Sequence, residues 1–198
     1  ELQVDASRIW LVRPGVDADT FVPPGFDVRD DVRARLGVRD HEALVVVAGR
    51  IQSTKGQDLA VRMLEHLDDA VLAIAGEPPP GDEGFVDELV EIATSLGVED
   101  RVRRIGSLDR PDLARLLGAA SLVVVPSRAE TFGIVALEGL ASGCRLVVSS
   151  GGGLSEAAGP GARTFDFGDA TALGDALTEA LDDEISETQQ KAWLDHLD

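Results

Sequence analysis

The chain has 198 residues, enough for one substantial core, and 44% of them are hydrophobic, an ordinary fraction for a globular domain. It carries 18 basic and 36 acidic side chains, and a net charge of −18 repels nucleic acid and anionic membranes. We therefore expect neither as a partner. No apolar run approaches the roughly 18 residues that a membrane-spanning helix needs, so no transmembrane segment is expected.

The single cysteine, Cys144, rules out a disulfide within the chain and is typical of a reducing compartment, so we expect a cytoplasmic location. It stands between Gly143 and a Leu-Val-Val run, where a thiol is expected to be buried and inert. The histidines, His41, His66 and His196, share no ligand spacing, and no metal site is predicted.

Short apolar runs alternate with stretches of helical spacing along the whole chain. Most runs are rich in Val, Leu and Ile without polar alternation, which is typical of strands covered on both faces. In chain order, the predicted elements are strand 8–12, helix 28–36, strand 43–48, helix 57–67, strand 70–75, helix 85–96, strand 102–105, helix 111–117, strand 121–125, helix 132–141, strand 145–149, a weaker strand near 163–167 and helix 170–181.

Glycines and a proline at the element boundaries support these assignments. Gly37, Gly97, Gly118 and Gly143 follow the ends of helical patterns, and Pro111 begins one. The alternation predicts an α/β fold. We expect a Rossmann-like, doubly wound parallel sheet with right-handed crossovers and helices on both faces, hence three layers.

The domain organisation follows from the segments outside this alternation. Residues 1–25 include the first predicted strand and a stretch rich in proline and glycine, and we expect them to form a connector. Residues 26–185 form the predicted Rossmann-like domain, and residues 186–198 form a helical tail. In such sheets ligands bind beyond the carboxyl ends of the strands, so the segments after each strand are the candidate sites.

The segment GRIQSTKGQD follows strand 43–48. Gly49 permits a tight turn, and Arg50 and Lys55 flank a loop that opens onto a helix. Two cations beside a helix N-terminus favour a phosphate group through charge-assisted hydrogen bonds and the helix dipole. The alternative is two surface cations in a loop, and the scarcity of basic residues in this chain favours the phosphate site.

The segment PSRAETFGIVALEGLASG follows strand 121–125 and places Glu130 before a helix and Glu138 eight positions later. Gly133, at the helix start, lets a ligand approach the backbone amides. The helix is so apolar that a carboxylate on it needs a partner or a ligand, and vicinal hydroxyls of a ribose or hexose suit a carboxylate. The alternatives are a capping or ion-paired Glu138 and a solvated Glu130.

Together these segments resemble the retaining glycosyltransferases of family 4, whose GT-B architecture consists of two Rossmann-like domains. Five motifs carry the resemblance, in the family's order and over about residues 8–182: VRPGVDADTFVPP, VAGRIQSTKG, VRRIGSLDR, VVVPSRAETFGIVALEGLASG and SGGGLSEAAG. The resemblance implies the C-terminal, donor-binding domain. Its partner would then be the missing N-terminal GT-B domain of the same protein.

The resemblance also implies a reaction, in which a hexose passes from a nucleotide-diphosphate sugar, such as a UDP- or GDP-sugar, to an acceptor with retention. Arg50, Lys55 and Glu130 are the implied catalytic residues. The two cations stabilise the charge that grows on the leaving diphosphate, and Glu130 holds hydroxyls of the sugar. No metal or other cofactor is then needed. The other implied donor-binding residues are Gly49, Ile105, Leu108, Phe132, Gly133, Ile134, Val135 and Glu138.

Among these donor-binding residues, the resemblance assigns Glu138 to the ribose hydroxyls and Ile105 and Leu108 to the base. Two other functions remain compatible with the sequence. A nucleotide-sugar 2-epimerase shares the two-domain architecture and needs no acceptor, and a non-catalytic domain would bind a nucleotide or another phosphorylated ligand. The order of the motifs favours the transferase, and we expect the donor-binding half alone to bind its donor without turnover.

Overall fold

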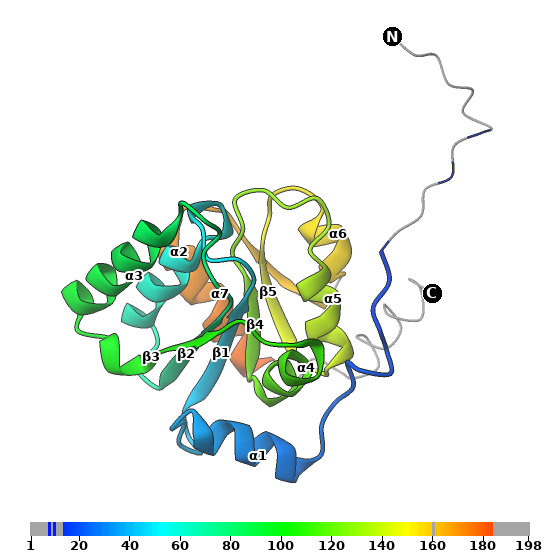
Figure 1. The fold of residues 1–198 in the computed structure, drawn as a ribbon, viewed down its shortest axis with the longest axis horizontal. Coiled ribbons are helices and arrows are strands. Elements are labelled where there is room, and N and C mark those ends of the chain that lie inside the picture. Colours follow the sequence, from blue (N-terminus) through cyan, green and yellow to red (C-terminus); the bar gives the residue numbers. More distant parts are fainter. Residues whose placement is uncertain (1–7, 9, 11–13, 160, 184–198) are drawn as a thin grey trace.

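The domain is built on one parallel sheet. The computed structural model describes residues 8, 10, 14–159 and 161–183. Within them, six strands form a sheet in the order β3-β2-β1-β4-β5-β6, and every neighbouring pair is parallel (Figure 1). The strands are β1 (Ala43–Ala48), β2 (Ala70–Ala75), β3 (Val102–Gly106), β4 (Leu122–Val125), β5 (Arg145–Ser149) and β6 (Arg163–Phe165).

Helices cover both faces of this sheet, which confirms the predicted three-layer α/β fold. One face packs against α2, α3 and α7, and the other against α4, α5 and α6, with α1 beside α4. The helices are α1 (Phe26–Arg35), α2 (Gln57–Arg62), α3 (Glu83–Leu96), α4 (Arg110–Ala119), α5 (Ile134–Ala141), α6 (Leu154–Ala158) and α7 (Ala170–Asp182), and the 3₁₀ turns are η2 (Ser53–Lys55), η3 (Met63–Glu65) and η4 (Glu99–Arg101).

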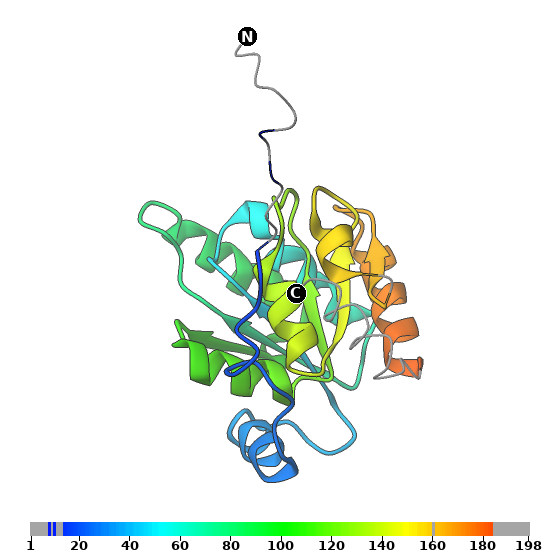
Figure 2. The same ribbon diagram turned by 90° about the vertical axis from the view of Figure 1, so that its right-hand side faces the viewer.

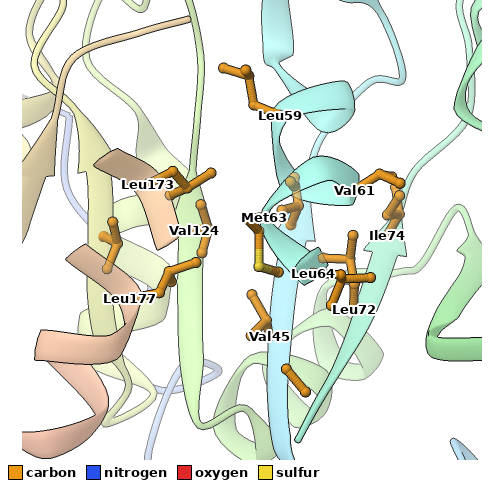
Figure 3. Packing of buried hydrophobic residues seen from close by; sticks show 14 of the residues in the cluster. Val45, Leu59, Val61, Met63, Leu64, Leu72, Ile74, Val124, Leu173 and Leu177 are labelled. Carbon is orange, nitrogen blue, oxygen red and sulfur yellow. The ribbon is translucent and has the colours of Figure 1, made fainter. Parts of the chain in front are cut away.

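The first face shows how the segment after β1 packs (Figure 3). Met63 and Leu64 lie against the sheet beside Val45 of β1 and Leu72 of β2. Leu177 of α7 lies over β4, the next strand of the sheet. All five side chains are fully buried. Burying one such side chain stabilises the fold by about 1.5–3 kcal/mol. The predicted helix 57–67 is shorter than expected, because α2 gives way to the tighter turn η3, in which two successive side chains meet the core.

The glycines and the proline that were predicted to mark helix boundaries do so, with one exception. Gly37, Gly97 and Gly143 adopt positive φ angles just after helices, and α4 has its proline in the first turn. Gly118 does not follow a helix; it lies inside α4. A Cβ there would lie 2.3 Å from Pro24 Cδ, so this glycine lets the connector pack closely on the helix.

The two ends of the sheet differ in what they carry. Turning the domain by 90° (Figure 2) shows α1 at one end and the loops before α2, α5 and α6 at the opposite end. The predicted strand 8–12 falls mostly outside the described residues, and neither Arg8 nor Trp10 is in a strand; the predicted tail 186–198 lies outside them entirely. Among the described residues, none of the helices combines the length and apolar character that a membrane crossing requires.

Candidate functional site

A cavity of about 360 Å³ lies at the carboxyl ends of β1 and β4, the two central strands. The winding of the sheet reverses between them, because β2 and β3 extend it on one side and β5 and β6 on the other. In doubly wound sheets ligands bind at such a switch point. The structure brings to this wall most of the predicted site residues: Gly49, Arg50, Lys55, Glu130, Phe132, Gly133, Ile134 and Val135.

Lys55 and Glu130 form an ion pair on the cavity wall. Lys55 Nζ donates to Glu130 Oε2 at 2.5 Å, and the two side chains are only 22% and 18% exposed. The residues are 75 positions apart in sequence, so the pair joins the loop after β1 to the loop after β4. Glu130 is therefore not a solvated loop acid. The wall offers a cation for a phosphate and an acceptor for a hydroxyl side by side.

The backbones of the two loops are joined as well. The Arg128 N–H donates to the Thr54 carbonyl at 2.9 Å. Gly56 has a φ of +72°, and a Cβ on it would lie 1.9 Å from the Pro126 carbonyl oxygen. Only glycine fits this contact, because any side chain would both collide and sit in a left-handed conformation. These contacts hold Lys55 from both sides and define its place on the wall.

The glycine-rich turn after β5 supports the loop that carries Glu130. The Gly153 N–H donates to the Glu130 carbonyl at 3.0 Å, and a Cβ on Gly152 would lie 2.2 Å from the same oxygen. At the start of α5, a Cβ on Gly133 would lie 2.4 Å from Leu154 Cδ2. The N–H of Gly153 therefore holds the loop in place.

Gln57 is a wall residue that the sequence reasoning missed. It begins α2, is fully buried, and donates from Nε2 to the Arg50 carbonyl at 2.9 Å. Its Oε1 is buried without a hydrogen-bond partner among the described residues, an arrangement that costs about 1–3 kcal/mol. The sequence feature that could have indicated Gln57 is its position, since it is a polar residue at the start of a helix that faces the core. Other wall residues that were not anticipated are Pro14, Val47, Ala48, Val124, Val125, Pro126, Ser127 and Thr131.

Glu138 lies outside the cavity wall, one turn further along α5 than Ile134, and is 3% exposed. Arg110 Nη1 donates to its Oε1 at 3.0 Å, and the same guanidinium lies over the Phe21 ring, 4.8 Å from the centroid. Burial raises the pKa of Glu138, and the charge and hydrogen bond of Arg110 oppose that rise. Of the alternatives that the sequence left open for Glu138, the structure shows the ion-paired one. Its partner, Arg110, was not predicted from the sequence.

The structure does not bring Ile105 and Leu108 to the cavity. They line a separate hollow of about 550 Å³, whose wall also includes residues of α1 and α4 such as Val32 and Leu116. The physical reason is the strand order, since β3 is an edge strand and β2 separates it from β1. Their assignment to the base of a nucleotide stays a prediction from the resemblance.

Cys144 is buried, as predicted, and burial raises the pKa of its thiol to about 12, so the thiolate is not available at neutral pH. In the described part of the chain, no group of three or more His, Cys, Asp or Glu side chains is placed to hold a metal ion. The charged side chains that line the cavity are Arg50, Lys55 and Glu130.

The fold defines a Rossmann-like domain with a cavity at the switch point of its sheet. Comparison with known sequences gives its family. Residues 28–192 match the family described as Glycosyl transferases group 1, and the chain belongs to this family. The sheet with its helices matches solved GT-B glycosyltransferases over nearly its whole length.

Three relatives illustrate the likeness. The D-inositol 3-phosphate glycosyltransferase of Mycobacterium sp. (strain KMS) is 42% identical over 150 residues, covering 76% of this chain and 34% of the relative. Sucrose-phosphate synthase from Thermosynechococcus elongatus superposes with a TM-score of 0.83 at 28% identity, over 95% of this chain and 47% of that one. Anabaena HepE in complex with UDP-glucose has a TM-score of 0.87 at 23% identity, over 94% and 53%. The chain spans about a third of the length of that curated relative.

Proposed function

We propose that this chain is the donor-binding half of a hexosyltransferase that uses a nucleotide-diphosphate sugar and retains the anomeric configuration. The observation that carries the proposal is the convergence of Arg50, Lys55 and Glu130 on one cavity at the switch point of the sheet. The UDP-glucose complex of the structurally similar HepE supports this class of donor. The acceptor would be bound by an N-terminal GT-B domain of the same protein.

The two cations act on the diphosphate in this proposal. Negative charge grows on the diphosphate as the glycosidic bond breaks, and fixed cations stabilise that charge more in the transition state than in the ground state. Arg50 is exposed at the cavity mouth and Lys55 is mostly buried in its wall, so they approach the diphosphate at two depths. The proposed scheme places this stabilisation on the two side chains without a metal ion.

Glu130 acts on the transferred sugar in this proposal. Lys55 is paired with Glu130, so a diphosphate that contacts Lys55 competes with this carboxylate and can draw the ammonium away from it. The released carboxylate can then accept hydrogen bonds from hydroxyls of the sugar. The first turn of α5 lines the cavity at Gly133, Ile134 and Val135, and its backbone N–H groups favour oxygens of phosphate or sugar.

Calorimetric titration with UDP, GDP and ADP tests the proposal. At least one nucleotide should bind the wild-type domain, and Arg50→Ala combined with Lys55→Ala should weaken it by at least about tenfold, since charge-assisted hydrogen bonds contribute about 1.5–3 kcal/mol each. Arg62→Ala is the matched control, because Arg62 is an exposed arginine at the end of α2 and lies outside the cavity wall. Absence of binding at millimolar nucleotide, or equal binding by the double variant, would overturn the proposal.

A further inference from the structure

We propose that Arg110 is a positioning residue, which holds the Glu138 carboxylate in the orientation that binds the ribose hydroxyls of the nucleotide. The inference rests on the proposed function and adds a residue to it. Arg110 belongs to α4, whereas the cavity wall is built from β1, β4 and the elements that follow them. The link between α4 and the nucleotide runs through Glu138.

The first argument is that the two carboxylate oxygens of Glu138 differ in their hydrogen-bond partners. Oε1 of Glu138 accepts from Arg110 Nη1 at 3.0 Å, whereas Oε2 accepts no hydrogen bond from any described residue. The side chain is only 4% exposed, yet Oε2 is not among the side-chain atoms of the described residues that are both fully buried and unpaired, so it keeps some accessible surface. One oxygen is thus anchored and the other is left for a ligand. A hydroxyl pair on a ribose supplies the donors that this oxygen needs.

The second argument is the place of Arg110 in its helix. It is the first residue of α4, which Asp109 caps by accepting from the Asp112 N–H at 2.9 Å. A cation in the first turn opposes the helix dipole and destabilises a helix. The ion pair with Glu138 offsets this cost. A cation at this position therefore serves an interaction outside its own helix.

The third argument is that Arg110 is itself held. Its guanidinium lies 4.8 Å from the centroid of the Phe21 ring, and Phe21 is 1% exposed although it belongs to the connector. Stacking on an aromatic ring is favourable and restricts the rotation of the guanidinium. The side chain of Arg110 is 54% exposed, so without Phe21 it would have many orientations. Phe21 fixes Arg110, and Arg110 fixes Glu138.

Nucleotides with and without ribose hydroxyls separate this role from a merely structural one. The wild type, Arg110→Gln and Glu138→Gln are titrated with UDP, GDP and ADP and with their 2′,3′-dideoxy forms. We expect the wild type to bind the ribonucleotide at least about tenfold more tightly than the dideoxy form, because hydrogen bonds from the ribose hydroxyls to a carboxylate are charge-assisted. Arg110→Gln should reduce this ratio to about threefold or less while the affinity for the dideoxy form changes less than about twofold.

Three further variants test whether Arg110 acts through its charge and its fixed orientation. Phe21→Leu should reduce the ratio by a smaller factor than Arg110→Gln, since it loosens Arg110 without removing its charge. Arg110→Lys keeps the charge but lacks the planar guanidinium, so it should recover part of the ratio. Arg115→Gln, on the same helix and 64% exposed, is the matched control and should leave the ratio unchanged. Thermal unfolding of each variant confirms that it is folded.

The possible failures can be told apart. If the wild type binds none of the nucleotides, the proposed function is wrong and this inference falls with it. If the wild type binds ribonucleotide and dideoxynucleotide equally, Glu138 does not bind the ribose, and the inference is wrong while the diphosphate site stands. If the wild type discriminates and Arg110→Gln keeps the ratio, or loses affinity equally for both forms, only the role of Arg110 is overturned.

Discussion

The two ends of the sheet carry hollows that differ in size and in construction. The cavity at the carboxyl ends of the strands measures about 360 Å³, and the hollow at the amino ends measures about 750 Å³. The larger hollow is lined by Arg29, His41, His66, Asp68 and Arg145, among others, so it is also rich in charge. Volume and charge alone would favour the amino end as the ligand site.

The way in which each end of the sheet is built favours the carboxyl end as the ligand site instead. At the carboxyl end, Gly56 and Gly152 allow backbone contacts that no other residue would fit, and these contacts lock the loops around the cavity. At the amino end, charged side chains serve the fold: Arg33 donates to the Glu42 carbonyl at 2.6 Å, and Arg39 pairs with the Glu42 carboxylate. Parallel strands also direct the N-termini of the helices that follow them to the carboxyl end, so the dipoles of these helices favour anions there.

Gly56→Ala should have the largest effect on this comparison. A Cβ at this left-handed position meets a carbonyl oxygen at 1.9 Å, so the loops must separate, and we expect the free energy of unfolding to fall by about 3 kcal/mol. Urea unfolding measures the change. Gly84→Ala is the matched control, because Gly84 lies in α3 with open space around it, and alanine there should stabilise by about 0.5–1 kcal/mol. Equal stability of both variants would show that the carboxyl end is not locked.

Glu130→Gln should change binding by different amounts for a nucleoside diphosphate and for the corresponding nucleotide sugar. Removing the charge frees Lys55, so a nucleoside diphosphate should bind about fivefold more tightly, as expected for a partly exposed ion pair of about 1 kcal/mol. The nucleotide sugar should gain less or bind more weakly, because its hydroxyls lose a charged acceptor. Calorimetry with UDP and UDP-glucose, or their GDP or ADP equivalents, measures both. Weaker binding of the nucleoside diphosphate would contradict the competition for Lys55.

The stability of Glu42→Gln at different pH values should show that a charge at the amino end stabilises the fold. Hydrogen bonds from the Arg39 side chain and backbone N–H lower the pKa of Glu42 from 4.5 to about 2. A carboxylate with a lowered pKa stabilises the fold fully above its unfolded pKa and loses this contribution as the pH falls through the folded pKa. The wild type should therefore be more stable than the variant near pH 6, by somewhat under about 1 kcal/mol because Arg39 is solvent-exposed.

Urea unfolding between pH 6 and pH 2 follows this difference, which should shrink steadily as the pH falls below 4.5. Nucleotide affinity at pH 7 should not change, since Glu42 lies at the other end of the sheet. A difference in stability that does not depend on pH would show that the carboxylate contributes by packing rather than by charge.

Arg145→Ala should have the smallest effect. Arg145 begins β5 and lines the amino-end hollow, so its removal should change nucleotide affinity less than about twofold, while Lys55→Ala loses about tenfold or more. The same calorimetric titrations compare the two. A loss for Arg145→Ala as large as that for Lys55→Ala would place the nucleotide at the amino end and reverse the comparison.

The sequence predicted the sheet better than the site. Strands 43–48, 70–75 and 145–149 were predicted to the residue, because buried parallel strands are continuous apolar runs bounded by polar or glycine-containing segments. Gly118 was placed wrongly since a glycine that ends a helix and a glycine that admits a packed proline look alike in sequence. Arg50, Lys55 and Glu130 were found because they follow strands whose carboxyl ends must meet.

The sequence by itself determined the α/β class, the parallel sheet and the end of the sheet that carries the cavity, since hydrophobic periodicity and turn residues act over a few positions. Only the tertiary structure decided which side chains meet. Lys55 pairs with Glu130, which lies 75 positions away in the sequence. Arg110 pairs with Glu138, 28 positions away, and its guanidinium lies over the ring of Phe21. These partners depend on strand order and helix packing, which bring distant residues together and leave no periodic signal in the chain.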